Sequence, residues 1–274
     1  MVSQEQRRRQ LAREKFLRQQ QRRTEARRKA RVRNSAIASV LGVIVIGAVA
    51  LYTTHVLGDG DKKTEASAKT TPSASAPPSK APDPCQKPAV GSVKKLSWKK
   101  EPAMSIDTSA KYTLDLATTC GDIPIALKAS AAPHTVNSFD FLAGKGYFDH
   151  TKCHRLTTQG IYVLQCGDPQ GTGMGGPGYT LPDENLKDAS LKKHTYPAGT
   201  VAMANTGQKH TGGSQFFLVY KDSPLPPQYT PFGTIDAAGM KVLNKIAGAG
   251  ESTGQGDGAP NATVVINKAT VTKS

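Results

Sequence analysis

The stretch CHRLTTQGIYVLQCGD, residues 153–168, combines two strand-like runs with an isolated arginine. The runs at 153–156 and 162–165 are short, rich in apolar residues and separated by a polar turn, which predicts two neighbouring strands. Arg155 is the only arginine after residue 33, and the other eleven precede it. A guanidinium directs its N–H donors in a fixed plane, so a lone arginine among lysines indicates a geometric role. The alternative interpretation is a structural arginine that bonds loop carbonyls.

The start of the chain has the composition of a charged tail. Residues 1–33 contain 13 Lys or Arg against three Glu, a net charge of +10 within the total of +15. The positive charge is therefore poor evidence that a folded domain binds nucleic acid, and no nucleic-acid partner is expected. We expect a basic cytoplasmic tail at residues 1–34 whose residues 1–33 bind anionic membrane lipid.

An uncharged apolar run follows the tail. Residues 35–57, SAIASVLGVIVIGAVALYTTHVL, would form a helix about 35 Å long at about 1.5 Å per residue. The hydrocarbon core of a bilayer is about 30 Å thick, so this length predicts a transmembrane helix. Basic residues precede it and Asp59 and Asp61 follow it, which places the N-terminus in the cytoplasm and the rest outside the cell membrane.

A cleaved signal peptide is the competing interpretation of the same run. Ala48-Val49-Ala50 has the small-x-small pattern of a cleavage site. The basic region before it would then be unusually long, which favours an uncleaved anchor, but the sequence leaves cleavage open. Both interpretations export the remainder of the chain.

The exported part begins with a linker and continues into one domain. Residues 58–84 are rich in Pro, Ser, Ala, Thr and Lys, so they bury too little apolar surface to fold and are expected to be extended. Residues 85–274 are long enough for one well-packed domain, with its core at 111–272.

The pattern of residues 111–272 is that of a mainly β domain. Alternation at 111–117 and 122–127 predicts a hairpin, and Pro133 stands where the first turn of a helix at 135–144 would begin. Further strands are expected at residues 153–156, 162–165, 201–204, 215–219, 232–235 and 262–272, and a second helix near 240–246. Short strands, Gly-rich turns and only two helices are typical of a closed or sandwich-like β fold capped by helices.

Several motifs of other protein classes are incomplete. Gly171, Gly173 and Gly176 match G-x-G-x-x-G, but Pro177-Gly178 stands where a phosphate-binding helix should begin, so a glycine turn that passes close to another group is favoured. Ser214 lacks the surroundings of a hydrolase nucleophile. No cofactor and no metal is expected.

The four cysteines are more consistent with disulfides than with zinc. In an exported domain cysteines usually pair with each other, and their spacing fits no common zinc pattern. Four cysteines allow three pairings, which the sequence leaves open. Adjacent antiparallel strands would bring Cys153 near Cys166 and leave Cys85 with Cys120.

Three runs carry a resemblance to a known family: HRLTTQGIYVLQCGDPQGTGMGGPGY (154–179), VAMANTGQKHTGGSQFFLVY (201–220) and YTPFGTI (229–235). They combine an arginine, amide side chains and apolar residues, without an activated nucleophile. In this order they resemble the cyclophilin-type peptidyl-prolyl cis/trans isomerases, and more closely the membrane-anchored, extracytoplasmic cyclophilins of actinobacteria. The resemblance covers residues 111–272 and implies a closed antiparallel eight-stranded barrel capped by two helices.

The resemblance also implies the roles of individual residues. It assigns catalysis to Arg155, Gln165 and Phe217, and substrate binding to Tyr162, Val163, Met203, Ala204, Asn205, Gln215, Leu225 and Tyr229. The implied activity is isomerisation of X-Pro bonds during the folding of exported proteins, by a monomer that acts on proline-containing polypeptides. The alternative is a binding module for proline-containing segments with little turnover.

The chain departs from the family pattern at four positions. Tyr162-Val163 replaces the usual Phe-Met pair, Pro224 stands where cyclosporin-sensitive members often have Trp, and Tyr229 stands where His is usual. The spacing from Arg155 to Gln165 is also two residues longer than the commonest one. We therefore expect weak cyclosporin binding.

Overall fold

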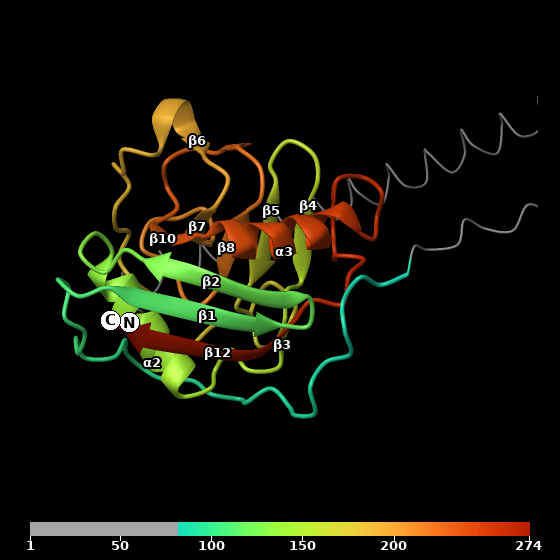
Figure 1. The fold of residues 1–274 in the computed structure, drawn as a ribbon. Coiled ribbons are helices and arrows are strands. Elements are labelled where there is room, and N and C mark those ends of the chain that lie inside the picture. Colours follow the sequence, from blue (N-terminus) through green and yellow to red (C-terminus); the bar gives the residue numbers. More distant parts are fainter. Residues whose placement is uncertain (1–81) are drawn as a thin grey trace, which may run out of the picture. The chain divides into compact units, whose positions relative to one another are not determined.

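The computed structural model describes residues 82–274, which form a curled antiparallel sheet with two helices packed against it (Figure 1). In chain order the elements are β1 (Tyr112–Thr118), β2 (Gly121–Leu127), α2 (Pro133–Gly144), β3 (Thr151–Lys152), β4 (Arg155–Thr157), β5 (Val163–Cys166), η1 (Lys192–His194), β6 (Thr195–Tyr196), β7 (Thr200–Met203), β8 (Phe216–Val219), β9 (Ser223–Pro224), β10 (Pro231–Ile235), α3 (Ala237–Gly248), β11 (Asp257–Gly258) and β12 (Val265–Lys273). The predicted tail and transmembrane helix, and nearly all of the linker, lie outside these residues. No helix within 82–274 is long and apolar enough to cross a membrane.

The main sheet is open at its two ends. Ten strands form one sheet in the order β11-β4-β5-β8-β7-β10-β2-β1-β12-β3, and β6 and β9 form a separate two-stranded sheet. Within the described part of the chain, no pairing joins β11 to β3. Eight strands of three or more residues do follow one another in this sheet, but the closed barrel that the resemblance implied is wrong, because the two-residue strands β11 and β3 end the described sheet without pairing with each other.

The longer predicted elements are confirmed with small shifts at their ends. β1 and β2 pair from Tyr112 opposite Leu127 to Thr118 opposite Gly121, as the predicted hairpin requires. Pro133 begins α2, where its missing N–H costs nothing. α3 begins three residues earlier than predicted, because the side chain of Asp236 accepts a hydrogen bond from the backbone N–H of Gly239 (2.7 Å) and caps the helix.

Alternation along the central strands separates two apolar clusters. In β8, Phe216 and Leu218 belong to the main core, whereas Phe217 and Val219 belong to a smaller cluster on the opposite face. Successive side chains of a strand point to opposite faces, so every strand next to β8 is divided in the same way. The smaller cluster contains Val163, Tyr196, Ala202, Phe217 and Val219, with Ile161, Leu191, Ala204, Leu225 and Tyr229 packed against it.

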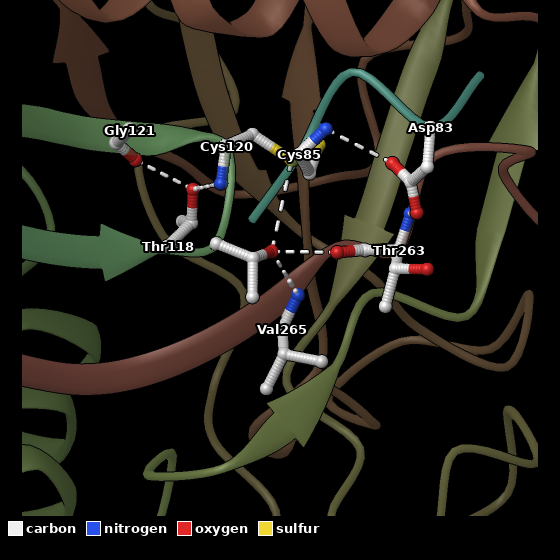
Figure 2. The surroundings of a disulfide bond; sticks show 8 residues. Asp83, Cys85, Thr118, Cys120, Gly121, Thr263 and Val265 are labelled. Carbon is white, nitrogen blue, oxygen red and sulfur yellow. Dashed lines mark hydrogen bonds between the residues drawn. A yellow bond between two sulfur atoms is a disulfide. The ribbon is translucent and has the colours of Figure 1, made fainter. Parts of the chain in front are cut away.

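Two disulfides link the pairs that adjacency of the strands favours, Cys153 with Cys166 and Cys85 with Cys120. The second fastens the segment before β1 to the turn of the first hairpin (Figure 2). Asp83 strengthens this attachment, because its carboxylate accepts hydrogen bonds from the backbone N–H groups of Cys85 and Thr263, both 3.0 Å. The segment around Asp83 and Cys85, which precedes the region of resemblance at 111–272, is thus part of the folded domain.

The glycine-rich loop, residues 169–180, is built around the buried carboxylate of Asp168. Backbone N–H groups of Gln170 (2.7 Å), Thr172 (2.9 Å) and Gly173 (2.6 Å) donate to it. A side chain at Gly175 would collide with this carboxylate, so the predicted close approach of the loop to another group is confirmed. Burial acts to raise the pKa of Asp168, but these backbone hydrogen bonds outweigh it and hold the pKa below its ordinary value.

We predict that Asp168→Asn lowers the free energy of unfolding at pH 7 by about 1–3 kcal/mol, because an amide NH₂ would face backbone donors. The lowered pKa of Asp168 means that its stabilisation is present above the unfolded pKa and is lost as the pH falls through the folded pKa. The variant should therefore lose less stability than the wild type between about pH 5 and pH 2 in urea unfolding. Asp122→Asn, at an exposed position of β2, is the control. Identical pH dependence in the wild type and Asp168→Asn would contradict this account.

Candidate functional site

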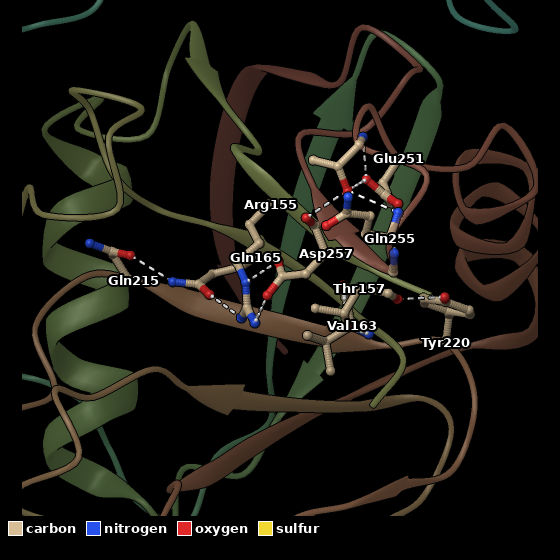
Figure 3. A network of polar contacts seen from close by, with 11 residues as sticks. Arg155, Thr157, Val163, Gln165, Gln215, Tyr220, Glu251, Gln255 and Asp257 are labelled. Carbon is tan, nitrogen blue, oxygen red and sulfur yellow. Dashed lines mark hydrogen bonds and ion pairs between the residues drawn. The ribbon is translucent and has the colours of Figure 1, made fainter. Parts of the chain in front are cut away.

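The site is centred on Arg155, which lies in the short strand β4 between β5 and β11. On one side the side chain of Asp257 accepts two hydrogen bonds from the guanidinium, Nε to Oδ1 at 2.7 Å and Nη2 to Oδ2 at 2.8 Å. On the other side Nη1 donates to Oε1 of Gln165, the residue opposite Arg155 in the ladder, at 3.3 Å (Figure 3). The guanidinium is thus held in one orientation by groups on both neighbouring strands.

The guanidinium keeps two N–H donors for a further partner. A guanidinium carries five N–H bonds, one on Nε and two on each terminal nitrogen. Asp257 and Gln165 occupy one on each of the three nitrogens. One N–H on Nη1 and one on Nη2 have no acceptor among residues 82–274, and the side chain of Arg155 is 36% exposed. These donors are available to a bound molecule.

A chain of amide groups orients Gln165. Its Nε2 donates to Oε1 of Gln215 (2.8 Å), and Nε2 of Gln215 donates to the backbone carbonyl of Gly175 (2.9 Å). With the amide NH₂ committed to Gln215, the carbonyl oxygen of Gln165 faces the guanidinium. Figure 3 shows Gln215 bound to Gln165, and the bond from Gln215 to Gly175 connects the glycine-rich loop to the site.

The loop before β11 fixes the position of Asp257. The buried carboxylate of Glu251 accepts hydrogen bonds from the backbone N–H groups of Thr253 (2.6 Å) and Gly256 (2.8 Å), which folds the loop tightly. Burial acts to raise the pKa of Glu251, but these bonds hold it below its ordinary value. β11 then pairs with β4, with Asp257 opposite Thr157.

An apolar cavity of about 110 Å³ lies beside Arg155. Its lining combines the amides and guanidinium described above with the smaller apolar cluster: Arg155, Ile161, Val163, Gln165, Ala204, Asn205, Phe217, Leu225 and Tyr229. The ring of Tyr229 meets that of Phe217 edge to face, with centroids 5.5 Å apart. A protein cavity of about 150 Å³ can hold benzene, a six-membered ring. The cavity beside Arg155 is somewhat smaller, which suits a five-membered ring.

The cavity brings together most of the predicted site residues, but not all of them. Met203 lies in the main core, because it shares a face of β7 with Val201, whereas Ala202 faces the smaller cluster. Tyr162 precedes β5 and packs its ring against Tyr220, with centroids 5.8 Å apart. Both residues were predicted to bind substrate, and neither lines this cavity. Gln215 lines a larger groove next to the cavity.

Two residues of the site were not predicted. Ile161 could have been found from its spacing, since Ile161, Val163 and Gln165 alternate and all line the cavity. Asp257 lies 102 residues after Arg155 in β11, a strand of two residues that is too short to show periodicity, and nothing near it in the sequence marks it as a partner.

A model of the family described as "Cyclophilin type peptidyl-prolyl cis-trans isomerase/CLD" matches residues 113–271, more than half of the chain. The chain belongs to this family. Its fold is similar to a crystal structure of a cyclophilin type peptidyl-prolyl cis-trans isomerase from Cryptosporidium parvum, with a TM-score of 0.50 and 26% identity, over 60% of this chain and 99% of the other.

Similar peptidyl-prolyl cis-trans isomerases occur in several bacteria. A probable peptidyl-prolyl cis-trans isomerase B of Mycobacterium leprae is 50% identical over 165 residues, and one of Mycobacterium tuberculosis is 49% identical over the same length. These matches cover 57% of this chain and 56% and 53% of the relatives, so the chain spans about half the length of the mycobacterial proteins. Peptidyl-prolyl cis-trans isomerase B of Bacillus subtilis is 43% identical over 114 residues, 41% of this chain and 75% of that protein.

We predict that Asp257→Asn slows isomerisation of an X-Pro peptide, the reaction that names the family, by about tenfold. An amide accepts only through its oxygen, so it would lose one of the two bonds that orient Arg155. The loss of activity should appear in kcat, with the KM and the urea unfolding midpoint nearly unchanged. Asp257→Glu, which keeps the carboxylate, should retain more activity than Asp257→Asn. Asp122→Asn is the control for removal of a carboxylate elsewhere. Full activity of Asp257→Asn would show that the ion pair does not position Arg155.

Proposed function

We propose that this cyclophilin is a peptidyl-prolyl cis/trans isomerase that acts on proline-containing polypeptides. The observation that carries the proposal is the oriented guanidinium of Arg155, which keeps two free N–H donors. It lies beside an apolar cavity large enough for the five-membered ring of proline. That geometry and the likeness to the mycobacterial isomerases together support the proposed activity and substrates.

The reaction requires rotation about one bond and no covalent step. Resonance gives the C–N bond partial double-bond character and a barrier of about 18–20 kcal/mol. In the twisted state the prolyl nitrogen regains its lone pair and can accept a hydrogen bond. A catalyst therefore needs only to bind the twisted amide more tightly than the planar one.

The site offers both contributions to that preference. A free N–H of Arg155 would donate to the prolyl nitrogen, and it would do so only in the twisted state. The cavity beside Phe217 would hold the proline ring in apolar surroundings, which disfavour the more polar planar amide. The second amide N–H of Gln165, which its bond to Gln215 leaves free, would bind the peptide backbone together with Asn205, which also lines the cavity.

The rival proposal is a module that binds proline segments with little turnover. Tyr229 is the observation in its favour, since its ring stands at the wall of the cavity, against Phe217, where the family usually has His. The two proposals differ in whether Arg155 accelerates rotation or only contributes to binding.

We predict that Arg155→Ala lowers kcat/KM for an X-Pro peptide by about a hundredfold, because removal of one directed donor to a developing charge costs that much in other enzymes. Exchange between cis and trans peptide signals by NMR measures the rate directly. Arg155→Lys keeps the charge without the planar fork, and it should recover little of the activity. Equal rates in the wild type and Arg155→Ala would contradict the role of Arg155, and slow exchange in both with intact peptide binding would favour the binding module.

We further propose that the domain is tethered outside the cell membrane and assists the folding of exported proteins, as in the membrane-anchored actinobacterial cyclophilins that the sequence resembles. The uncharged run at 35–57, which lies outside the described residues, supplies the anchor in this proposal. Two disulfides support it, because structural disulfides form and persist in oxidising compartments.

We predict that protease added to intact cells cuts the chain within the Pro- and Ser-rich residues 58–84 and releases the cyclophilin domain. The basic residues 1–34 should stay protected on the cytoplasmic side. Immunoblots against tags at the two ends distinguish the fragments, and cells opened with detergent are the control. Protection of both tags in intact cells would overturn the proposed topology.

A further inference from the structure

A groove of about 1020 Å³ adjoins the apolar cavity and shares Gln165, Ala204 and Asn205 with it. Part of its wall is the glycine-rich loop, including Gly173 to Thr180. Another part is Lys99, Lys100 and Glu101, which precede β1 and lie outside the region that the family model matches. A polypeptide bound with its proline in the cavity would continue along this groove.

The three residues 99–101 form a bridge whose start is held against the domain. The backbone N–H of Trp98 donates to the carbonyl of Pro177 (2.8 Å), and its ring meets that of Phe141 edge to face with centroids 5.0 Å apart. Gly178 has a φ of +91°, and any side chain there would collide with Ser97 and Trp98. The segment therefore lies directly on the glycine-rich loop.

The end of the bridge is held by α2. The side-chain amide of Asn137 donates to the carbonyls of Pro102 (3.3 Å) and Ala103 (3.1 Å) and accepts from the backbone N–H of Ser105 (2.9 Å). The disulfide between Cys85 and Cys120 fastens the same segment further upstream. Residues 99–101 are thus fixed at both ends beside the groove.

The bridge gives the groove a positive edge. Glu101 lies 3.3 Å from the Nδ1 of His134, whereas Lys99 and Lys100 are exposed and have no carboxylate partner among residues 82–274. The remaining lining residues of the groove are uncharged. Two lysines and one glutamate therefore line this end of the groove, a net charge of +1, with the carboxylate of Glu101 turned toward His134.

We infer that Lys99 and Lys100 select polypeptides that carry acidic residues within a few positions of the proline, on the flank that lies in the groove. The inference rests on the proposed function and adds a substrate preference to it. A groove of this volume admits several extended residues at about 3.3 Å each, so a carboxylate a few residues from the proline can reach the lysines. Because both ammonium groups are exposed, the effect should weaken as salt is added.

The test uses the full chain in detergent and peptides with a central Ala-Pro. Two residues of one flank or the other are Glu, Gln or Lys, and kcat/KM is measured by NMR exchange at low and high salt. For the flank that lies in the groove, the wild type should prefer Glu over Gln by about three- to tenfold at low salt. Lys99→Glu/Lys100→Glu should reverse this preference in favour of the Lys peptide.

The matched control is Lys87→Glu/Lys95→Glu, which makes the same charge change at exposed positions of the same segment that do not line the groove. This variant should keep the preference for Glu. A preference that is absent in the wild type, or that changes equally in both double variants, would overturn the inference. Failure of the wild type to isomerise the Gln peptides would instead refute the proposed function.

Discussion

The two hydrogen bonds between Arg155 and Asp257 determine what the site can do, because they fix the plane of the guanidinium. A free arginine side chain samples many rotamers, and ordering it during a reaction would cost conformational entropy. Here the fold orders it in advance, with Asp257 on one neighbouring strand and Gln165 on the other. Two donors remain in a known direction beside the apolar cavity, which is the arrangement that preorganised electrostatic stabilisation requires.

The surrounding structure keeps these strands in register. Cys153 stands two residues before Arg155 and Cys166 follows Gln165 directly, so their disulfide joins the strands at the level of the site. The buried carboxylates of Asp168 and Glu251 order the two loops that flank it, and each does so by accepting backbone N–H groups. Two loops ordered by buried carboxylates and one apolar cluster thus surround a guanidinium that is itself partly exposed.

The sequence predicts those parts of this arrangement that depend on local pattern. The first hairpin, both helices and the strands that carry Arg155, Gln165 and Phe217 follow from alternation, proline position and glycine turns. The closed barrel was implied by the family resemblance rather than by a local pattern, and it is wrong because the end strands β11 and β3 do not pair within the described residues. Asp257 could not be predicted, since its contact with Arg155 spans 102 residues and arises only when β11 pairs with β4. Met203 was predicted to bind substrate together with Ala204 and Asn205, but alternation within β7 turns its side chain into the main core.

The most direct test of the account is the NMR signal of the Nε–H of Arg155, identified by its loss in Arg155→Lys. A guanidinium held by Asp257 should give a slowly exchanging Nε–H and slow rotation of the terminal nitrogens, unlike arginines exposed to water. Addition of an Ala-Pro peptide should shift this signal, while the matched Ala-Ala peptide should leave it in place. A signal that exchanges rapidly and responds to neither peptide would contradict the claim that an oriented guanidinium faces the bound proline.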